Sequence, residues 1–258
     1  MQMVESLEKN MDTPLCRAFL DPSGQVKSLD FTVSRLGILD WDFFVAVGPD
    51  ALKWLASESL DVPVFYAMVL EPDRIIGQSD RFCGVTFNLF TAHRIERIKQ
   101  IFPKLTRLAV IHNPENNRIY KDVLAQFSKV SGVSAVPVTV SSQTGISRAL
   151  QTAAAQADAI YFIPDHTVIS PAIVKYIIEN GISRGIPSIG YNRFFHESGA
   201  ILSLSVDYEA VGRQVAQMVT RFREEGTCEN MEPEANILYN ENVGKLLKME
   251  VQKQFLNR

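Results

Sequence analysis

The chain alternates between short apolar runs and longer amphipathic segments. Runs without polar alternation cover residues 43–47, 64–69, 108–111 and 159–163, the pattern of strands that are buried on both faces of a parallel sheet. Between the runs, apolar residues recur at helical spacing over segments of about 10–15 residues. This alternation predicts an α/β protein with parallel sheets and helices on both faces.

The run at 159–163 leads into the most informative loop of the chain. The run stops at Pro164 and continues as Asp165-His166-Thr167. It then reaches Ser170-Pro171, where serine is a good N-cap and proline fits the first helical position. In open α/β sheets, ligands bind where loops leave the carboxyl ends of strands, and helix N-termini add free N–H donors there. Asp165, His166 and Thr167 are therefore our first candidates for ligand contact.

Local signals mark further elements. Asp207 is predicted to cap a long amphipathic helix that ends at Gly226, and Asn240 to cap a final helix. The spacing of apolar residues between positions 29 and 38 predicts another helix. The acidic, proline-containing segment 227–234 is expected to be a surface connection.

One order of elements occurs twice along the chain. An aspartate, an apolar strand, a loop, a helix and a short strand begin at Asp42 and again at Asp158. This weak repeat of about 116 residues suggests two similar α/β lobes. Because the closing strand and helix lie far from either half, we expect the chain to pass between the lobes more than once. The predicted division is residues 1–87 with 204–232 for the N-terminal lobe, and 88–203 with 233–258 for the C-terminal lobe.

Composition and charge argue against several classes of function. Hydrophobic residues make up 46% and charged residues 21% of the chain, with a formal net charge of −3, which is typical of a soluble globular protein. No basic block is present, so nucleic acid is not an expected partner. The apolar runs are shorter than a membrane span, and Met1–Glu8 lacks the apolar core of a signal peptide. As it stands, the chain is expected to be soluble and to carry no targeting signal.

The cysteines are Cys16, Cys83 and Cys228. Their odd number, their wide spacing and the absence of a Cys-x-x-Cys pair imply neither a disulfide framework nor a zinc site. We expect all of them to be small buried hydrophobic residues.

Convergent catalytic chemistry is not evident in the sequence. We find no Walker A, Gly-x-Gly-x-x-Gly or His-Glu-x-x-His pattern, and the histidines, at positions 93, 112, 166 and 196, share no metal-ligand spacing. We therefore expect a protein that is not an enzyme and that holds no cofactor or metal. An enzyme with a flavodoxin-like fold is the alternative for this architecture.

Neutral polar groups, aromatic rings and isolated acids follow several predicted strands. Such groups would hold a small zwitterion or polar ring, with hydroxyl and N–H donors for a carboxylate, an acid for an ammonium group and an aromatic face for the apolar body. The alternative is that each residue caps its own loop, because Asn, Asp and Thr are common in turns. Taken as a set, they favour binding. The set is Tyr66, Met68, Asn113, Glu115, Asp165, Thr167, Tyr191, Asn192 and Asp207.

These segments also resemble a known family, the ABC-transporter substrate-binding proteins of the group that includes tryptophan- and tyrosine-binding lipoproteins. Each similar segment is weak alone, but their ordered set is specific and covers roughly Val26 to Val251. The segments are Val45–Ala51, Val64–Val69, Cys83–Thr86, Arg107–Pro114, Asp158–Ser170, Ile186–Gly190 and Ser205–Gln214.

The resemblance implies the type I periplasmic-binding-protein fold, in which two Rossmann-like (flavodoxin-like) lobes are joined by a hinge and close on a small organic ligand. We expect an amino acid or a similar molecule, with aromatic amino acids among the candidates. The resemblance also implies an ABC permease as membrane partner and a periplasmic or membrane-anchored extracellular location. Around the ligand cleft it places Gly48, Pro49, Asp50, Met68 to Glu71, Asn113 to Asn117, Asp165 to Thr167, Tyr191, Asn192 and Asp207.

Two features depart from the family pattern. Members usually begin with an export signal and then a first strand and helix, whereas this chain begins within that helix, so we expect the N-terminal lobe to lack its first strand. The loop at 164–167 reads Pro-Asp-His-Thr, where members often have Asn or Pro beside the Asp. The alternative function is a ligand-binding sensory module of a signalling protein with the same fold.

Overall fold

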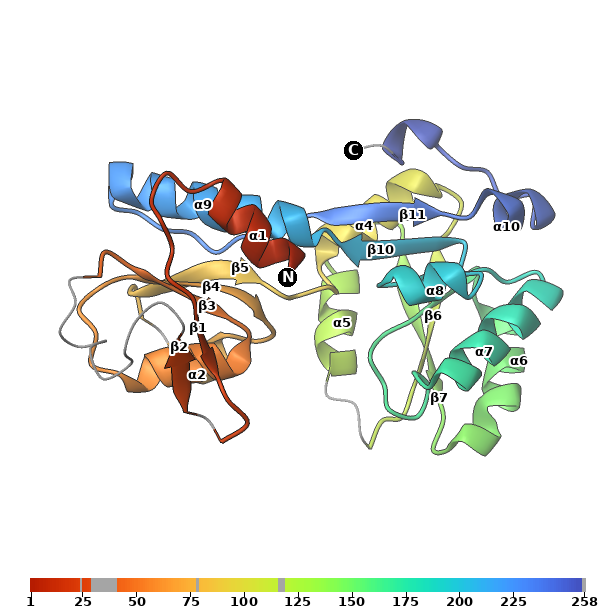
Figure 1. The fold of residues 1–258 in the computed structure, drawn as a ribbon. Helices are drawn as coiled ribbons and strands as arrows, with labels where there is room; N and C mark the ends of the chain where they lie inside the picture. The colour runs from red at the N-terminus through yellow and green to blue at the C-terminus, as the bar shows by residue number, and fades with distance from the viewer. Residues whose placement is uncertain (24, 29–40, 78, 116–118, 257–258) are drawn as a thin grey trace. The chain divides into compact units, whose positions relative to one another are not determined.

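The computed structural model describes residues 1–23, 25–28, 41–77, 79–115 and 119–256. It divides into two compact units, residues 1–88 with 207–234 (unit 1) and residues 89–206 with 235–258 (unit 2). The chain passes between the units at positions 88–89, 206–207 and 234–235. Unit 1 combines a parallel sheet with helices, and unit 2 combines a mainly parallel sheet with helices (Figure 1), so the predicted α/β class is confirmed.

Unit 1 is built on a parallel sheet in the order β3-β4-β5. A separate antiparallel hairpin, β1-β2, belongs to the same unit. Its strands are β1 (Ala18–Leu20), β2 (Val26–Ser28), β3 (Phe44–Val47), β4 (Val64–Val69) and β5 (Phe82–Thr86). Its helices are α1 (Gln2–Lys9), α2 (Pro49–Ser57), α3 (Asp73–Ile76) and α9 (Tyr208–Glu225).

Helix α9 begins and ends where the sequence predicts. The Asp207 carboxylate accepts a hydrogen bond from Ala210 N–H at 3.0 Å, and Gly226 ends the helix in the left-handed conformation with φ 68°. Helix α1 packs against α9 through buried Met3 and Leu7. The two backbones approach closely at Gly212, because a Cβ there would collide with the backbone of α1.

The run at 43–47 is less buried than predicted. Ala46 is fully buried, whereas Phe44 and Val45 are half-buried and Val47 is 40% exposed. Strand β3 pairs with β4 on one side, and no strand within the described ranges pairs with its other side. The prediction of a strand buried on both faces was therefore wrong for this run.

Unit 2 is built on a sheet in the order β11-β10-β9-β8-β6-β7, in which only β11 runs antiparallel to its neighbour. The strands are β6 (Arg107–His112), β7 (Ser134–Thr139), β8 (Ala159–Tyr161), β9 (Ser188–Gly190), β10 (Leu202–Val206) and β11 (Ala235–Tyr239). The helices are α4 (Ala92–Ile101), α5 (Ile119–Phe127), α6 (Ile146–Gln156), α7 (Pro171–Ser183), α8 (Arg193–Glu197) and α10 (Glu241–Leu246), with 3-10 turns η2 (Gln143–Gly145) and η3 (Lys253–Phe255).

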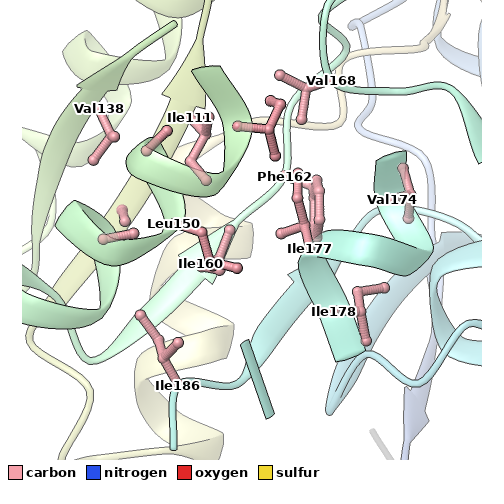
Figure 2. Packing of buried hydrophobic residues seen from close by; sticks show 14 of the residues in the cluster. Ile111, Val138, Leu150, Ile160, Phe162, Val168, Val174, Ile177, Ile178 and Ile186 are labelled. Atoms are coloured by element: carbon pink, nitrogen blue, oxygen red, sulfur yellow. The ribbon is translucent and has the colours of Figure 1, made fainter. Parts of the chain in front are cut away.

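The core of unit 2 lies where α6 and α7 cover the sheet. Leu150 of α6, Ile177 of α7 and Ile160 of β8 are all nearly or fully buried in one cluster (Figure 2). Helix α7 starts at the predicted cap, because Ser170 Oγ accepts from Ile173 N–H at 3.4 Å. Asn240 likewise caps α10 through Val243 N–H at 3.2 Å.

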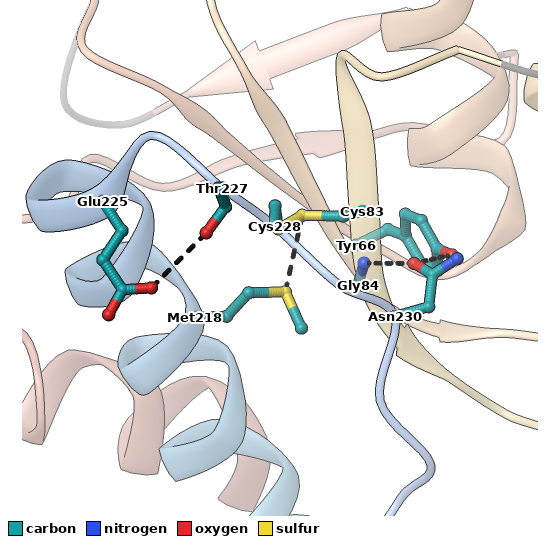
Figure 3. Close-up of a disulfide and its surroundings, with 8 residues drawn as sticks. All are labelled: Tyr66, Cys83, Gly84, Met218, Glu225, Thr227, Cys228 and Asn230. Carbon is teal, nitrogen blue, oxygen red and sulfur yellow. Dashed lines mark hydrogen bonds between the residues drawn. A yellow bond between two sulfur atoms is a disulfide. The ribbon is translucent and has the colours of Figure 1, made fainter.

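The cysteine prediction was wrong. Cys83 of β5 and Cys228 form a disulfide with a Cα–Cα distance of 6.1 Å, and Cys16 is free and exposed rather than buried. Cys83 is buried beside Met218 of α9, whose sulfur lies 3.6 Å from Cys83 Sγ (Figure 3). The pairing joins positions 145 residues apart, which spacing along the chain does not reveal.

The segment after α9 also does more than connect two elements. Asn230 Oδ1 accepts hydrogen bonds from Tyr66 Oη at 2.7 Å and from Gly84 N–H at 2.9 Å (Figure 3). Met231 donates to Gly84 O at 3.0 Å and accepts from Thr86 N–H at 2.9 Å. The predicted surface connection therefore covers the outer edge of β5.

Several elements lay outside the sequence predictions. The structure adds the short elements β2, α3 and α8, and the helix predicted between positions 29 and 38 lies outside the described residues. No described helix combines the length and apolar character that crossing a membrane requires.

Candidate functional site

The loops that we expected to bind a ligand leave neighbouring strands of unit 2. Strands β9, β8 and β6 are adjacent and parallel, so their carboxyl ends lie at one edge of the sheet. The loops at 113–115, 162–167 and 191–192 start there. We call these loops the unit 2 rim.

Asp165 is the buried anchor of this rim. It is 3% exposed, and its Oδ2 accepts from Asn113 N–H at 2.8 Å while its Oδ1 accepts from Thr167 N–H at 2.9 Å. Its backbone carbonyl also accepts from Val168 and Ile169 N–H groups. Asp165 thus fastens the loop after β8 to the loop after β6, and its carboxylate is directed into the protein.

Asn113 extends the network to a further loop. Its Nδ2 donates to Ser141 O at 3.3 Å and to Thr167 Oγ1 at 3.2 Å, and its Oδ1 accepts from Glu115 N–H at 3.1 Å. Asn113 is 3% exposed. The polar groups that remain exposed on this part of the rim are therefore those of Glu115 and His166.

An aromatic cluster adjoins the rim. Phe90 makes edge-to-face contacts with Tyr161 at 6.2 Å and Tyr191 at 5.6 Å between ring centroids, and Tyr191 also contacts Phe195 at 4.7 Å. Tyr191 is the half-buried member of this cluster, whereas the other rings are buried. Burial raises the pKa of Tyr191 to about 12, so its hydroxyl stays protonated near neutral pH and can donate a hydrogen bond.

Two further polar groups lie near the same end of unit 2. Arg94 is 4% exposed and donates to Leu204 O at 3.0 Å. Asn192 Oδ1 is a buried acceptor without a hydrogen-bond partner among the described residues. An acceptor left in this way is available to a donor from a ligand or a water molecule.

The corresponding edge of unit 1, the unit 1 rim, carries apolar groups and strained backbone. Val47, the last residue of β3, is 40% exposed, and Leu70, which directly follows β4, is 48% exposed. Met68 and Glu71 have positive φ angles of 61° and 50°, and the β4-β5 register shifts between Ala67 and Val69. Such conformations cost about 1–3 kcal/mol each outside glycine and are concentrated at functional sites.

The other predicted residues of unit 1 make local contacts. Gly48, with φ 90°, and exposed Pro49 form the turn into α2. Asp50 pairs with Lys53 at 3.8 Å and Glu71 with Arg74 at 3.0 Å. These ion pairs join residues three positions apart on the surface, where such pairs contribute little to stability.

Of the remaining predicted residues, Tyr66 and Asp207 make contacts within unit 1. Tyr66 is fully buried with its hydroxyl on Asn230, and burial together with the Asp73 carboxylate raises its pKa to about 12. Asp207 serves as the cap of α9. Asn117 lies outside the described residues.

Sequence reasoning missed Phe90 and Tyr161. Phe90 stands immediately before Thr91, which caps α4, and an apolar residue in that position usually packs against the first turn of its own helix. From the sequence, Tyr161 was interpreted as one more apolar residue of a buried strand. Only the adjacency of β8, β9 and the segment before α4 brings these rings to Tyr191.

The described residues include no cluster of three or more His, Cys, Asp and Glu side chains that could hold a metal ion. A Gly-x-Ser-x-Gly match at 181–185 lies at the C-terminal end of α7, not in the strand-to-helix turn that an esterase nucleophile needs. Its Ser183 hydroxyl donates to Glu179 O within the helix.

The fold is similar to several solved structures. A ligand-free, open substrate-binding protein with adhesive properties from Clostridium difficile matches with a TM-score of 0.71 and 18% identity, over 96% of this chain and 89% of that chain. An ABC domain in complex with L-Trp from Streptococcus pneumonia matches with a TM-score of 0.55 and 18% identity, over 86% and 79%. A conserved domain protein from Vibrio cholerae O1 biovar El Tor matches with a TM-score of 0.56 and 22% identity, over 84% and 77%.

These similarities define the class as an α/β protein of the type I periplasmic-binding-like fold. The chain belongs to the ABC transporter substrate binding protein family, whose sequence model matches residues 28–244. This membership confirms the resemblance found in the sequence and gives the protein a solute-binding role. A comparison with curated proteins gives no match.

Proposed function

We propose that the protein captures an amino acid with an aromatic side chain and delivers it to an ABC permease. The observation that carries the ligand class is the aromatic cluster at the unit 2 rim, where half-buried Tyr191 is supported by Phe90 and Phe195. A supported ring of this kind offers an aromatic ligand edge-to-face contact at low entropic cost. The neighbour from Streptococcus was solved with L-Trp, which agrees with this ligand class.

The polar groups of the rim match the two charged ends of an amino acid. The protonated Tyr191 hydroxyl and the exposed His166 imidazole can donate to a carboxylate, while Glu115 can accept from an ammonium group. In this proposal Asp165 and Asn113 do not touch the ligand. They hold the rim in the geometry that presents the other groups.

The disulfide supports a location outside the cytoplasm. Structural disulfides persist in oxidising compartments such as the periplasm and the cell surface, and Cys83–Cys228 joins two segments of unit 1. We propose a periplasmic or cell-surface location, as expected for the solute-binding component of an importer.

The test is a calorimetric and thermal-shift screen of the protein against the twenty amino acids. A ligand present at 100 times its dissociation constant stabilises the folded protein by about 2.7 kcal/mol, so Trp, Tyr or Phe should raise the melting temperature selectively. Tyr191→Ala should weaken binding about tenfold, since an aromatic contact of about 1–1.5 kcal/mol is lost. Tyr191→Phe should retain most of the affinity.

Tyr176→Ala is the matched control, because Tyr176 is 38% exposed on α7 of the same unit and belongs to no rim loop. Its affinity should equal that of the wild type. Selective binding of an aliphatic or acidic amino acid, or equal affinities for Tyr191→Ala and wild type, would contradict the proposed ligand class.

A further inference from the structure

Within the described part of the chain, the side-chain polar atoms that are buried without a hydrogen-bond partner all lie in one short stretch, residues 188–203. Two of the residues are almost completely buried, since Ser188 is 1% and Ser203 is 0% exposed. The atoms are Ser188 Oγ, Asn192 Oδ1, His196 Nδ1, Ser198 Oγ and Ser203 Oγ. Buried polar atoms are hydrogen-bonded to protein or to ordered water in the large majority of cases. Their concentration in one stretch therefore indicates a site whose partners come from outside the described side chains.

The two serines lie on the same face of the unit 2 sheet. Ser203 of β10 is opposite Gly190 of β9, and Gly190 comes two positions after Ser188, so the three residues share a face. Ser188 is also opposite Ile160, which belongs to the core that α6 and α7 cover. Both serine side chains are therefore on the side of the sheet that carries these helices.

Helix α8 covers the same face of the sheet. A Cβ atom on Gly190 would collide with Phe195, so α8 lies directly on β9 at this point, and it also contacts β10 and β11. Positions 192, 195 and 196 fall on one side of a helix. Asn192 and His196 are therefore on the side of α8 that carries Phe195 to the sheet. We call the region between α8 and strands β9 and β10 the α8 contact.

We propose that the α8 contact is a hydration site that holds internal water molecules. Serine hydroxyls donate and accept, the Asn192 oxygen accepts, and an imidazole nitrogen does either, so water can match every one of these atoms. None of the atoms belongs to a carboxylate, an ammonium or a guanidinium group, so the site offers no opposite charge to a buried ion. A buried water makes about three hydrogen bonds, and about two molecules therefore satisfy the whole set.

The water also fixes the segment that starts at the unit 2 rim. Tyr191 and Asn192 stand at the beginning of this segment, and the chain returns to the sheet at Ala200, whose N–H donates to Phe195 O at 2.9 Å. Water that bridges α8 to Ser188 and Ser203 holds the segment against the sheet. Half-buried Tyr191 is thereby held in its place at the rim.

The test is the sign of the stability change when one buried hydroxyl is removed from the full chain. A hydroxyl that is bonded to internal water contributes to stability, so Ser203→Ala should lower the melting temperature in calorimetry by about 2–4 °C. Ser188→Ala should lower it by a similar amount. A hydroxyl that is buried in a dry contact without any partner destabilises the fold instead. Melting temperatures that rise or stay the same in both variants would therefore overturn the proposal.

Ser134→Ala is the matched control, because Ser134 is an exposed residue of strand β7 in the same unit. Solvent can replace the hydrogen bonds of an exposed hydroxyl, so this variant should melt at the wild-type temperature. A fall in the control as large as that of Ser203→Ala would show that the loss does not come from buried water, and would overturn the assignment.

A crystal structure of the wild type, at a resolution that shows ordered water, provides the direct measurement. Water within hydrogen-bonding distance of Ser203 Oγ and Ser188 Oγ is the expected result. Direct hydrogen bonds among the polar side chains of the α8 contact, without water between them, would overturn the proposal. A dry contact or a bound molecule other than water would overturn it as well.

Discussion

Removal of the Cys83–Cys228 disulfide should strongly destabilise unit 1. The bridge joins positions 145 residues apart, and a cross-link that closes a loop of this length restricts the unfolded chain enough to stabilise by about 5 kcal/mol at 25 °C. If unit 2 stays folded while unit 1 unfolds, it already fixes the separation of residues 88 and 207. The disulfide then closes only residues 83–88 and 207–228, roughly 30 residues, for which the same relation gives about 3.6 kcal/mol.

The assay can observe unit 1 alone, because both tryptophans, Trp41 and Trp54, belong to it. Urea unfolding followed by tryptophan fluorescence should give a free energy of unfolding that is about 3.6 to 5 kcal/mol lower for the Cys83→Ala, Cys228→Ala double variant. Total stabilities of domains are about 5–15 kcal/mol, so the loss is large. Cys16→Ala is the control and should change the value by less than about 0.5 kcal/mol, since Cys16 is exposed and free.

Two results would refute this reasoning. One is a double variant that unfolds at the wild-type urea midpoint. The other is an unreduced wild type in which all three cysteines react with a thiol reagent in denaturant, because the structure leaves only Cys16 free.

Three further predictions concern single residues. Asp165→Ala should lower the free energy of unfolding of unit 2 by about 3 kcal/mol, because the Asn113 and Thr167 N–H groups lose a charged acceptor. Urea unfolding measures this decrease. A smaller decrease for Asp165→Asn would confirm that the lost acceptor is its cause. Burial works against ionisation of Asp158, but hydrogen bonds from Thr106 and Arg107 outweigh it and lower its pKa to about 2. The ionised Asp158 carboxylate therefore stabilises the fold by about 1–2 kcal/mol after screening; this contribution is present above about pH 4 and is lost as the pH falls through about 2. Asp158→Asn should remove this pH-dependent loss from a plot of unfolding free energy against pH. An unchanged loss in the variant would show that Asp158 is not its source. Gly84→Ala should destabilise unit 1 by about 3 kcal/mol, because the added methyl group would meet the Tyr66 carbonyl and ring; wild-type stability in the fluorescence assay would show that Tyr66 can move aside.

The candidate site shows which features local sequence patterns can predict and which they cannot. The loop at 164–167 was located from the sequence, since a buried apolar run followed by a polar turn and a capped helix is a local signal. The role of Asp165 was not, because its partner Asn113 lies 52 positions away. The structure shows this carboxylate holding neighbouring loops together, a role that the local pattern does not contain.

Tyr66 and Tyr191 illustrate the same division. Tyr66 lies within the apolar strand β4 and Tyr191 directly follows β9, yet Tyr66 is fully buried against the segment after α9, while Tyr191 stays half-buried beside Phe90. Their positions along the chain carry no sign of this difference. It depends on which segment covers each strand.

The sequence by itself determined the alternation of strands and helices apart from β2, α3 and α8, the caps at Ser170, Asp207 and Asn240, and the family of the chain. Backbone propensities and capping depend on residues within one or two turns, which is why these features could be predicted. The tertiary structure decided the Cys83–Cys228 pairing, the covering of β5 by the segment after α9 and the aromatic support of Tyr191. Each of these depends on strands and segments that are adjacent in space but distant in the chain. Such adjacency follows from the packing of the whole unit, which no local pattern records.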